Sequence, residues 1–217
     1  MSKIEAVIFD MDGVIVHSNP AHKKVIREFC GRYGIEVSEE KFREKIYGRT
    51  NKDWVPAVFG PLSDEKIQEY TDEKEQIFRD VFDPKEHVVP GIFEFLELLK
   101  NNGIKCVVAT SAPAENADYI LSELGIYSYF ETVLNSSHVT KSKPHPEPYL
   151  KAARSVGKSP ENCIVFEDSL SGVESGLAAG SKVVGVATTH THDELSSCSL
   201  VIDDFNGLEI EKLEAIL

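Results

Sequence analysis

Short, continuous apolar segments that alternate with amphipathic segments are the feature of this sequence that most restricts its fold. The apolar runs cover residues 4–9, 104–109, 163–166, 183–186 and 200–202. Each run is apolar at consecutive positions, which is typical of strands that are covered on both faces. The segments between the later runs show the helical spacing of apolar residues. We therefore predict an α/β fold in which helices cover both faces of a parallel sheet.

The helical segments also predict how the chain is divided. From residue 90 onward they cover residues 90–101, 113–124, 147–156 and 169–179, each closely followed by a glycine. Residues 18–88 carry helical patterns only, at 20–33, 38–46, 51–58 and 63–81, and no convincing strand. We predict a Rossmann-like, doubly wound parallel sheet formed by residues 1–17 and 89–217, with residues 18–88 inserted as an all-α cap.

The composition limits the partners that suit this chain. With 217 residues, 41% of them hydrophobic, the chain is long enough for one domain with an insertion. The formal net charge of −13 argues against nucleic acid or anionic lipid as the main partner. The sequence has neither a secretory signal nor an apolar run of about 18 residues that could span a membrane. We expect a cytoplasmic monomer or weak homodimer that binds a small molecule.

Polar residues follow the predicted strands at the points where each strand ends. In a parallel sheet these carboxyl ends lie at one edge, where ligands bind. The residues expected there are Asp10, Asp12, Thr110, Ser111, Glu167 and Asp168 after the strands, and Lys143 before the helix predicted at 147–156. Carboxylates this close repel one another, and a hard divalent cation with oxygen ligands relieves the repulsion. We therefore expect Mg²⁺ at this edge, with Asp10, Asp12, Asp168 and Glu167 as candidate ligands.

Two of the carboxylates suit the covalent chemistry of phosphoryl transfer. Asp10 can attack phosphorus in line and carry the phosphoryl group as a mixed anhydride. Asp12, two residues later, can protonate the leaving oxygen and then take a proton from water or from an acceptor hydroxyl. For a DxDG sequence considered alone, the alternative is a solvated turn or a helix cap.

The other residues at this edge suit the binding of a phosphoryl group. The Thr110 hydroxyl and the Ser111 backbone N–H are expected to hold phosphate oxygens, with Ala112 beside them. Lys143 is expected to bridge the nucleophile and the phosphoryl group. Glu167 has two possible roles: it ligates the metal together with Asp168, or it holds Lys143 or a metal-bound water.

These residues lie in four segments that resemble the sequence motifs of the haloacid dehalogenase superfamily. The segments are DMDGV at 10–14, Thr110 after a strand, SKPHPEPY at 142–149 and FEDSLSGVESGLAAG at 166–180. They follow the family's order and spacing along nearly the whole chain, and the helical insertion resembles the family's α-helical cap. The most similar branch contains phosphatases and mutases related to beta-phosphoglucomutase. The resemblance implies the fold, Mg²⁺ and phosphoaspartate chemistry.

The resemblance also implies that the cap contacts the substrate. Arg49, Asn51 and Lys52 lie where the family has its substrate-specificity loop, and the alternative is an ordinary exposed turn. His22 and Lys74 resemble further cap contacts of the family, for which the alternatives are a structural histidine and a solvated helix face. Asn51 departs from the mutase pattern, in which an arginine faces a second phosphate.

The predicted function is that of a Mg²⁺-dependent phosphatase that hydrolyses a small phosphorylated metabolite, such as a sugar phosphate, through a phosphoaspartate. A phosphosugar mutase of the beta-phosphoglucomutase type is the first alternative, because it uses the same core residues with a substrate hydroxyl as acceptor. A non-catalytic metabolite-binding protein is a more distant alternative, since such a protein has no need of a nucleophile.

Overall fold

The computed structural model describes residues 4–47 and 49–217, and its centre is a six-stranded sheet. The strands are β1 (Ala6–Phe9), β2 (Lys105–Ala109), β3 (Phe130–Leu134), β4 (Cys163–Glu167), β5 (Lys182–Val186) and β6 (Leu200–Ile202). Their order is β3-β2-β1-β4-β5-β6, and every neighbouring pair is parallel. The predicted parallel α/β sheet is confirmed, and the strand order reverses direction between β1 and β4.

Strand β3 and helix α9 (Ile210–Glu214) are elements that the sequence pattern does not reveal. β3 is an edge strand, and only Phe130 of its five residues is buried. A half-exposed edge strand mixes polar and apolar residues, so β3 lacks the continuous apolar run that marks its neighbours. α9 has only five residues, which is too short for a helical period to stand out.

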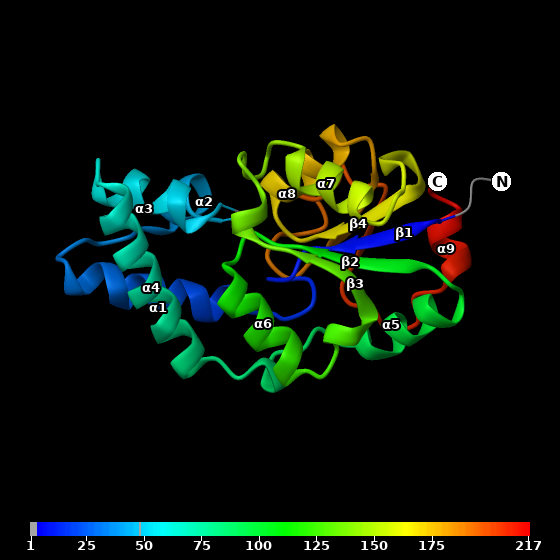
Figure 1. Cartoon of the computed structure of the whole chain (residues 1–217), viewed down its shortest axis with the longest axis horizontal. Coiled ribbons are helices and arrows are strands. Elements are labelled where there is room, and N and C mark those ends of the chain that lie inside the picture. The colour runs from blue at the N-terminus through cyan, green and yellow to red at the C-terminus, as the bar shows by residue number, and fades with distance from the viewer. Residues whose placement is uncertain (1–3, 48) are drawn as a thin grey trace.

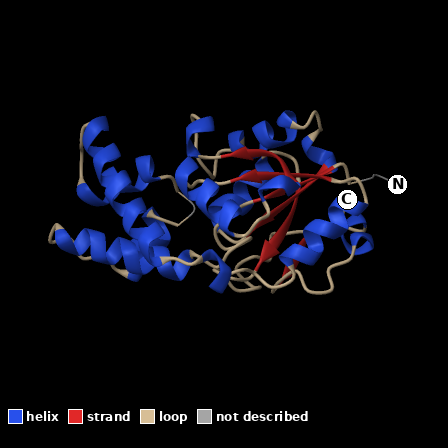
Figure 2. Ribbon diagram, turned by 60° about the horizontal axis from the view of Figure 1, so that its bottom comes forward, coloured by secondary structure: helices blue, strands red, loops and turns tan. Residues whose placement is uncertain are grey.

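Helices cover both faces of the sheet, as the continuous apolar strands require. α5 (Ile92–Asn101) and α6 (Ala114–Glu123) lie on one face, and α7 (Glu147–Ser155) and α8 (Leu170–Ala178) lie on the other (Figures 1 and 2). On the first face the Phe9 and Phe166 rings stack with centroids 5.3 Å apart, and Phe95 meets both rings edge-on. This aromatic cluster fixes β1 and β4 side by side, and these two strands lead into the acidic motif segments.

The helical insertion forms a separate layer, set to one side of the sheet in Figure 1, and is called the cap below. Its helices are α1 (Asn19–Arg32), α2 (Glu39–Lys45), α3 (Asn51–Phe59) and α4 (Asp64–Val81). They pack around a hydrophobic cluster of their own that includes Phe29, Phe42 and Trp54. Val16 and Val88 pair in an antiparallel bridge where the chain enters and leaves the cap. The predicted boundaries of the cap, residues 18 and 88, lie close to this bridge and stay a prediction.

The connections between these elements include short helical turns. 3₁₀ helices occur at Pro84–Glu86, Tyr127–Tyr129, Ser136–His138 and Pro160–Asn162. Among the residues that the structure describes, no helix is both long enough and apolar enough to cross a membrane.

A substitution at Gly91 tests how closely the segment after β6 packs against the start of α5. Its φ of +80° favours glycine, and a Cβ there would lie 2.5 Å from the Asn206 nitrogen. Gly103 has a φ of +67°, but nothing lies within 4 Å of its Cβ position. Both Gly91→Ala and Gly103→Ala place alanine in the left-handed region, but only Gly91→Ala adds a steric clash. In urea denaturation we therefore expect Gly91→Ala to lower the free energy of unfolding by about 3 kcal/mol and Gly103→Ala by about 1 kcal/mol. Equal losses would contradict the packing.

Candidate active site

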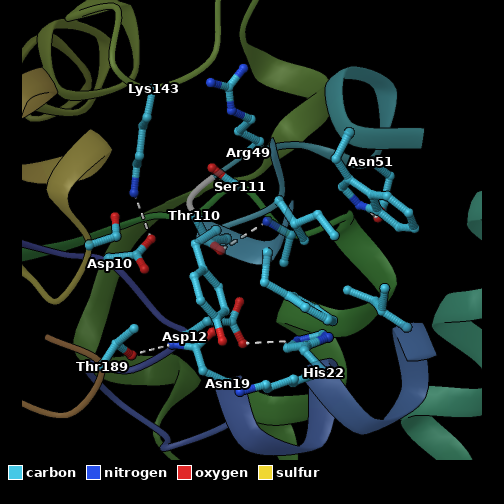
Figure 3. Close-up of a pocket in the computed structure, with 18 of the residues that line it drawn as sticks. Asp10, Asp12, Asn19, His22, Arg49, Asn51, Thr110, Ser111, Lys143 and Thr189 are labelled. Atoms are coloured by element: carbon cyan, nitrogen blue, oxygen red, sulfur yellow. Dashed lines mark hydrogen bonds and ion pairs between the residues drawn. The ribbon is translucent and has the colours of Figure 1, made fainter. Parts of the chain in front are cut away.

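The carboxyl ends of β1, β2 and β4 open into one pocket that also contacts the cap (Figure 3). Asp10 follows β1, Thr110 follows β2, Asp168 follows β4, and Lys143 comes from the loop before α7. These four residues are between 2% and 7% exposed. The strand order reverses between β1 and β4, which is where open α/β sheets form their ligand sites.

Lys143 lies between two carboxylates. Its Nζ donates to Asp10 Oδ1 and to Glu167 Oε1, both at 2.7 Å, and to the Ala109 carbonyl at 3.2 Å. Burial opposes the charge of the ammonium, but the two carboxylates outweigh it and hold the pKa of Lys143 above its ordinary value. The side chain is therefore a fixed positive charge that orients Asp10.

Both oxygens of Glu167 are held by donors of the protein. Oε1 accepts hydrogen bonds from Lys143 at 2.7 Å and from the Tyr149 hydroxyl at 2.6 Å. Oε2 accepts from the backbone N–H groups of Asp168 and Ser169 and from the Ser169 hydroxyl, each at 3.0 Å. Burial raises the pKa of Glu167, but Lys143 and these donors together bring it below its ordinary value. The geometry thus favours the predicted role in which Glu167 holds Lys143.

Two glycines of the motif segments leave room for the acidic side chains. A Cβ on Gly172 would lie 1.7 Å from Glu167 Oε1, and a Cβ on Gly13 would lie 1.9 Å from Asp168 Oδ2. Gly13 also has a φ of +84°, a conformation that disfavours other residues. A larger residue at either glycine would therefore fill the space that the Asp168 or the Glu167 carboxylate occupies.

Three buried carboxylates could hold a metal ion. Asp10, Glu167 and Asp168 each offer an oxygen, and these atoms lie within 4.8 Å of one another. Burial raises the pKa of Asp10 to about 7, with further contributions from the Glu167 and Asp12 charges, although Lys143 opposes the shift. Burial, together with the Glu167 and Asp10 charges, raises the pKa of Asp168 well above its ordinary value. Groups that resist ionisation in this way, with oxygen donors only, fit a hard divalent cation such as Mg²⁺.

The Asp12 carboxylate is directed toward the cap and lies outside this group of three. It accepts a hydrogen bond from the Ser18 hydroxyl, and its Oδ1 lies 3.3 Å from His22 Nε2. Burial raises the pKa of Asp12, but His22 and Ser18 outweigh it and bring the pKa below its ordinary value. This placement suits proton transfer better than the predicted metal ligation by the Asp12 side chain.

The start of α1 contributes two site residues that sequence reasoning missed. Asn19 Nδ2 donates to Asp168 Oδ2 at 2.9 Å and to Thr189 Oγ1 at 2.7 Å, and Ser18 holds Asp12. Figure 3 shows Asn19 next to Asp12 and His22. The available signal was the position of this polar pair directly before Pro20, between the first motif and the first cap helix.

The predicted phosphate-binding residues follow β2. Thr110, Ser111 and Ala112 all line the pocket. The Ala112 backbone N–H donates to Thr110 Oγ1 at 3.0 Å, so this donor is engaged within the loop. Their contacts with a phosphoryl group stay predictions.

His22 and Lys74 meet at the wall that the cap contributes to the pocket. The His22 ring stacks on Phe78 with centroids 3.8 Å apart, and its Nδ1 lies 3.3 Å from Lys74 Nζ. Lys74 also pairs with Glu75 at 2.6 Å, and both side chains are buried. Lys74 is therefore a buried residue of the pocket wall, so the alternative of a solvated helix face is wrong for it, and its contact with a substrate stays a prediction.

Two of the three residues predicted for the specificity loop line the pocket, and the third does not. Arg49 and Asn51 line it, but Asn51 Nδ2 donates to Glu75 Oε1 and Asn51 Oδ1 accepts from Trp54. Lys52 is exposed and lines a neighbouring groove instead. The reason is helical geometry, since consecutive residues of a helix face in different directions.

Comparison with known proteins identifies the family. The family model described as haloacid dehalogenase-like hydrolase matches residues 7–186. The chain belongs to this family. It is 34% identical over 189 residues to a phosphorylated carbohydrates phosphatase of Thermotoga maritima, which covers 84% of this chain and 85% of the relative. The predicted resemblance is confirmed, and the chain is an enzyme of the phosphatase type.

Solved structures agree with this assignment. A haloacid dehalogenase-type hydrolase of Entamoeba histolytica superposes with a TM-score of 0.88 and 32% identity over 98% of both chains. A beta-phosphoglucomutase of Clostridium difficile superposes with a TM-score of 0.87 and 27% identity over 98% of this chain and 96% of the other. The fold is thus shared by a hydrolase and a mutase.

Replacement of Asp10 tests the electrostatics of the pocket. A carboxyl whose folded-state pKa is about 7 binds its proton more tightly in the folded than in the unfolded chain, so the wild type loses stability as the pH rises from about 4 toward 7. Asp10→Asn removes this titration. In EDTA, we expect its free energy of unfolding relative to the wild type to rise by on the order of 3 kcal/mol between pH 5 and pH 8. A difference that stays constant with pH would contradict the buried charge.

Proposed function

We propose that this protein is a Mg²⁺-dependent phosphatase that hydrolyses a small phosphorylated metabolite, such as a sugar phosphate, through a phosphoaspartate at Asp10. The observation that carries the proposal is the pairing of Asp10 with Lys143 on one side and of Asp12 with His22 on the other. It supplies an oriented nucleophile and a separate proton carrier in one pocket. A non-catalytic binding protein would gain nothing from this arrangement.

The reaction has two displacements at phosphorus. An oxygen of Asp10 bonds to phosphorus while the bond from phosphorus to the ester oxygen breaks, and Asp12 protonates that oxygen. Water then attacks phosphorus, Asp12 takes the proton, and the bond to Asp10 breaks to release phosphate. His22 and Ser18 outweigh burial and lower the pKa of Asp12, but a phosphate dianion next to it raises its proton affinity, as a like charge does.

The other residues hold the transferred group. Thr110 and Ser111 would contact phosphoryl oxygens, and Lys143 would neutralise charge on them while it orients Asp10. Asp10 and Asp168 would ligate Mg²⁺, and Asn19 would fix Asp168. When bound, Mg²⁺ supplies positive charge to the phosphoryl oxygens.

The size of the pocket supports a small substrate. Its cavity volume is about 90 Å³, and cap residues such as Phe42, Ile46 and Trp54 line it together with the residues at the edge of the sheet. A pocket of this size beneath a cap favours a small ester over a phosphorylated protein or nucleic acid. We propose that residues 18–88 open to admit the substrate and close over it to exclude water other than the reacting molecule.

Phosphorus NMR tests the function directly. We expect the wild type with Mg²⁺ to release free phosphate from one preferred member of a panel of sugar phosphates that includes beta-glucose 1-phosphate with a trace of the bisphosphate. Asp10→Asn should abolish turnover, since it removes the nucleophile while the side-chain shape is kept. A shift of the resonance from the 1- to the 6-position would establish the mutase alternative, and a tenth of the wild-type rate in Asp10→Asn would contradict the mechanism.

The leaving group tests the role of Asp12. We expect Asp12→Ala to slow hydrolysis of an alkyl phosphate by roughly 10²- to 10⁴-fold, because the alkoxide needs a proton as it leaves. Hydrolysis of 4-nitrophenyl phosphate should fall much less, since nitrophenolate leaves without one. The measurement is kcat/KM for both esters with the wild type and the variant, and equal losses would remove the assignment.

A further inference from the structure

Glu75 is a buried carboxylate in the pocket wall that the proposed reaction does not use. It lies on α4, is 3% exposed and lines the pocket beside Lys74. Its Oε1 accepts hydrogen bonds from Asn51 Nδ2 and Lys74 Nζ, both at 2.6 Å, and its Oε2 accepts from Asn116 Nδ2 at 2.7 Å. Donors from α3, α4 and α6 thus fix the carboxylate in one position.

Glu75 cancels the positive charge that Lys74 would otherwise present to a substrate. Both side chains are buried, and their charged atoms lie 2.6 Å apart. Lys23, another lysine of the pocket wall, is paired with Glu39 at 2.5 Å. Within the described residues, Arg49 is the lining cation of the cap that has no carboxylate partner. Glu75 therefore removes one of the positive charges that the cap could offer a second anion, while Arg49 keeps its own.

The surroundings of Glu75 strengthen its effect. Ile26, Phe42, Ile46 and Trp54 line the same side of the pocket. Apolar walls screen charges poorly, so an anion brought close to the neutral pair of Glu75 and Lys74 loses its water and gains no net attraction in return. A hydroxyl group loses less on leaving water and can donate a hydrogen bond to Glu75. A carboxylate has about four acceptor positions, of which the three donors named above fill three.

We propose that Glu75 is a specificity-determining residue that restricts the untransferred part of the substrate to neutral, hydroxyl-bearing groups. Esters that carry a carboxylate or a second phosphate at that end are disfavoured, because the charge of Glu75 balances the Lys74 charge that would attract them. This inference rests on the proposed function and names the substrate class of the same site.

Competition between matched phosphate esters tests the inference. The reporter is the hydrolysis of 4-nitrophenyl phosphate with Mg²⁺, and inhibition constants are measured for two pairs of competitors. The pairs are sorbitol 6-phosphate with 6-phosphogluconate and glycerol 3-phosphate with 3-phosphoglycerate. In each pair one CH₂OH group is replaced by a carboxylate. A competitor lowers the reporter rate whether or not it is itself hydrolysed, so every compound gives a value.

We expect the wild type to bind the neutral member of each pair at least tenfold more tightly than the anionic member. Glu75→Gln should reduce this preference at least tenfold, because it removes the negative charge and leaves Lys74 uncompensated. Asn116→Ala is the matched control: Asn116 is buried and outside the pocket lining, so this variant loosens Glu75 but keeps its charge, and the preference should stay at the wild-type value. Because each result is a ratio, losses common to both competitors cancel.

Lys74→Met provides the opposite change of charge and covers the case in which Glu75→Gln does not fold. It leaves Glu75 uncompensated, so the preference for neutral esters should increase at least tenfold. A wild type without preference, or a preference that neither variant changes, would overturn the inference while reporter hydrolysis leaves the proposed function intact. Absence of Mg²⁺-dependent reporter hydrolysis in the wild type would instead overturn the proposed function, and the inference with it.

Discussion

The ion pair of Lys143 with Asp10 and Glu167 is the interaction on which the rest of the site depends. Two like charges 4 Å apart repel by about 4 kcal/mol at the effective dielectric constant of a protein surface, and burial increases the cost. Asp10, Glu167 and Asp168 are brought within 4.8 Å, and the Lys143 ammonium donates to two of them. Tyr149 then fixes Glu167 from α7. The charge balance of the pocket therefore locks β1, β4 and the loop before α7 into one arrangement that is ready to receive a phosphoryl group.

Two carboxylates of the site, Asp12 and Asp168, connect the reaction centre to the cap. Ser18 and His22 hold Asp12, and Asn19 holds Asp168, all from the first turn of α1 or the residue before it. The first cap helix thus carries the side chains that orient the proposed proton carrier and a candidate metal ligand. The proposed opening of the cap would withdraw these contacts, so closure and the assembly of the reaction centre would be one event.

The sequence predicts the parts of this structure that depend on strong local signals. Continuous apolar runs reveal five strands, and Asp10, Thr110 and Asp168 follow three of them at one edge of the sheet. Strand β3 is missed because an edge strand has no such run. The contacts of Asn19 with Asp168 and of Glu75 with Asn116 could not be predicted for another reason: they join residues far apart in the chain, and their geometry depends on how the cap meets the sheet.

The core half and the cap half of the pocket carry different charges. This difference offers an explanation of how hydrolases and mutases can share one fold and one set of core residues. The core half handles the transferred phosphoryl group with Lys143 and the acidic cluster. A mutase must also grip a bisphosphate at its far end, which needs positive charge in the cap. Here Asn51 instead donates to Glu75, and Glu75 neutralises Lys74. Glu75 therefore leaves less positive charge in the cap for a second phosphate, and this supports the proposal that water accepts the phosphoryl group.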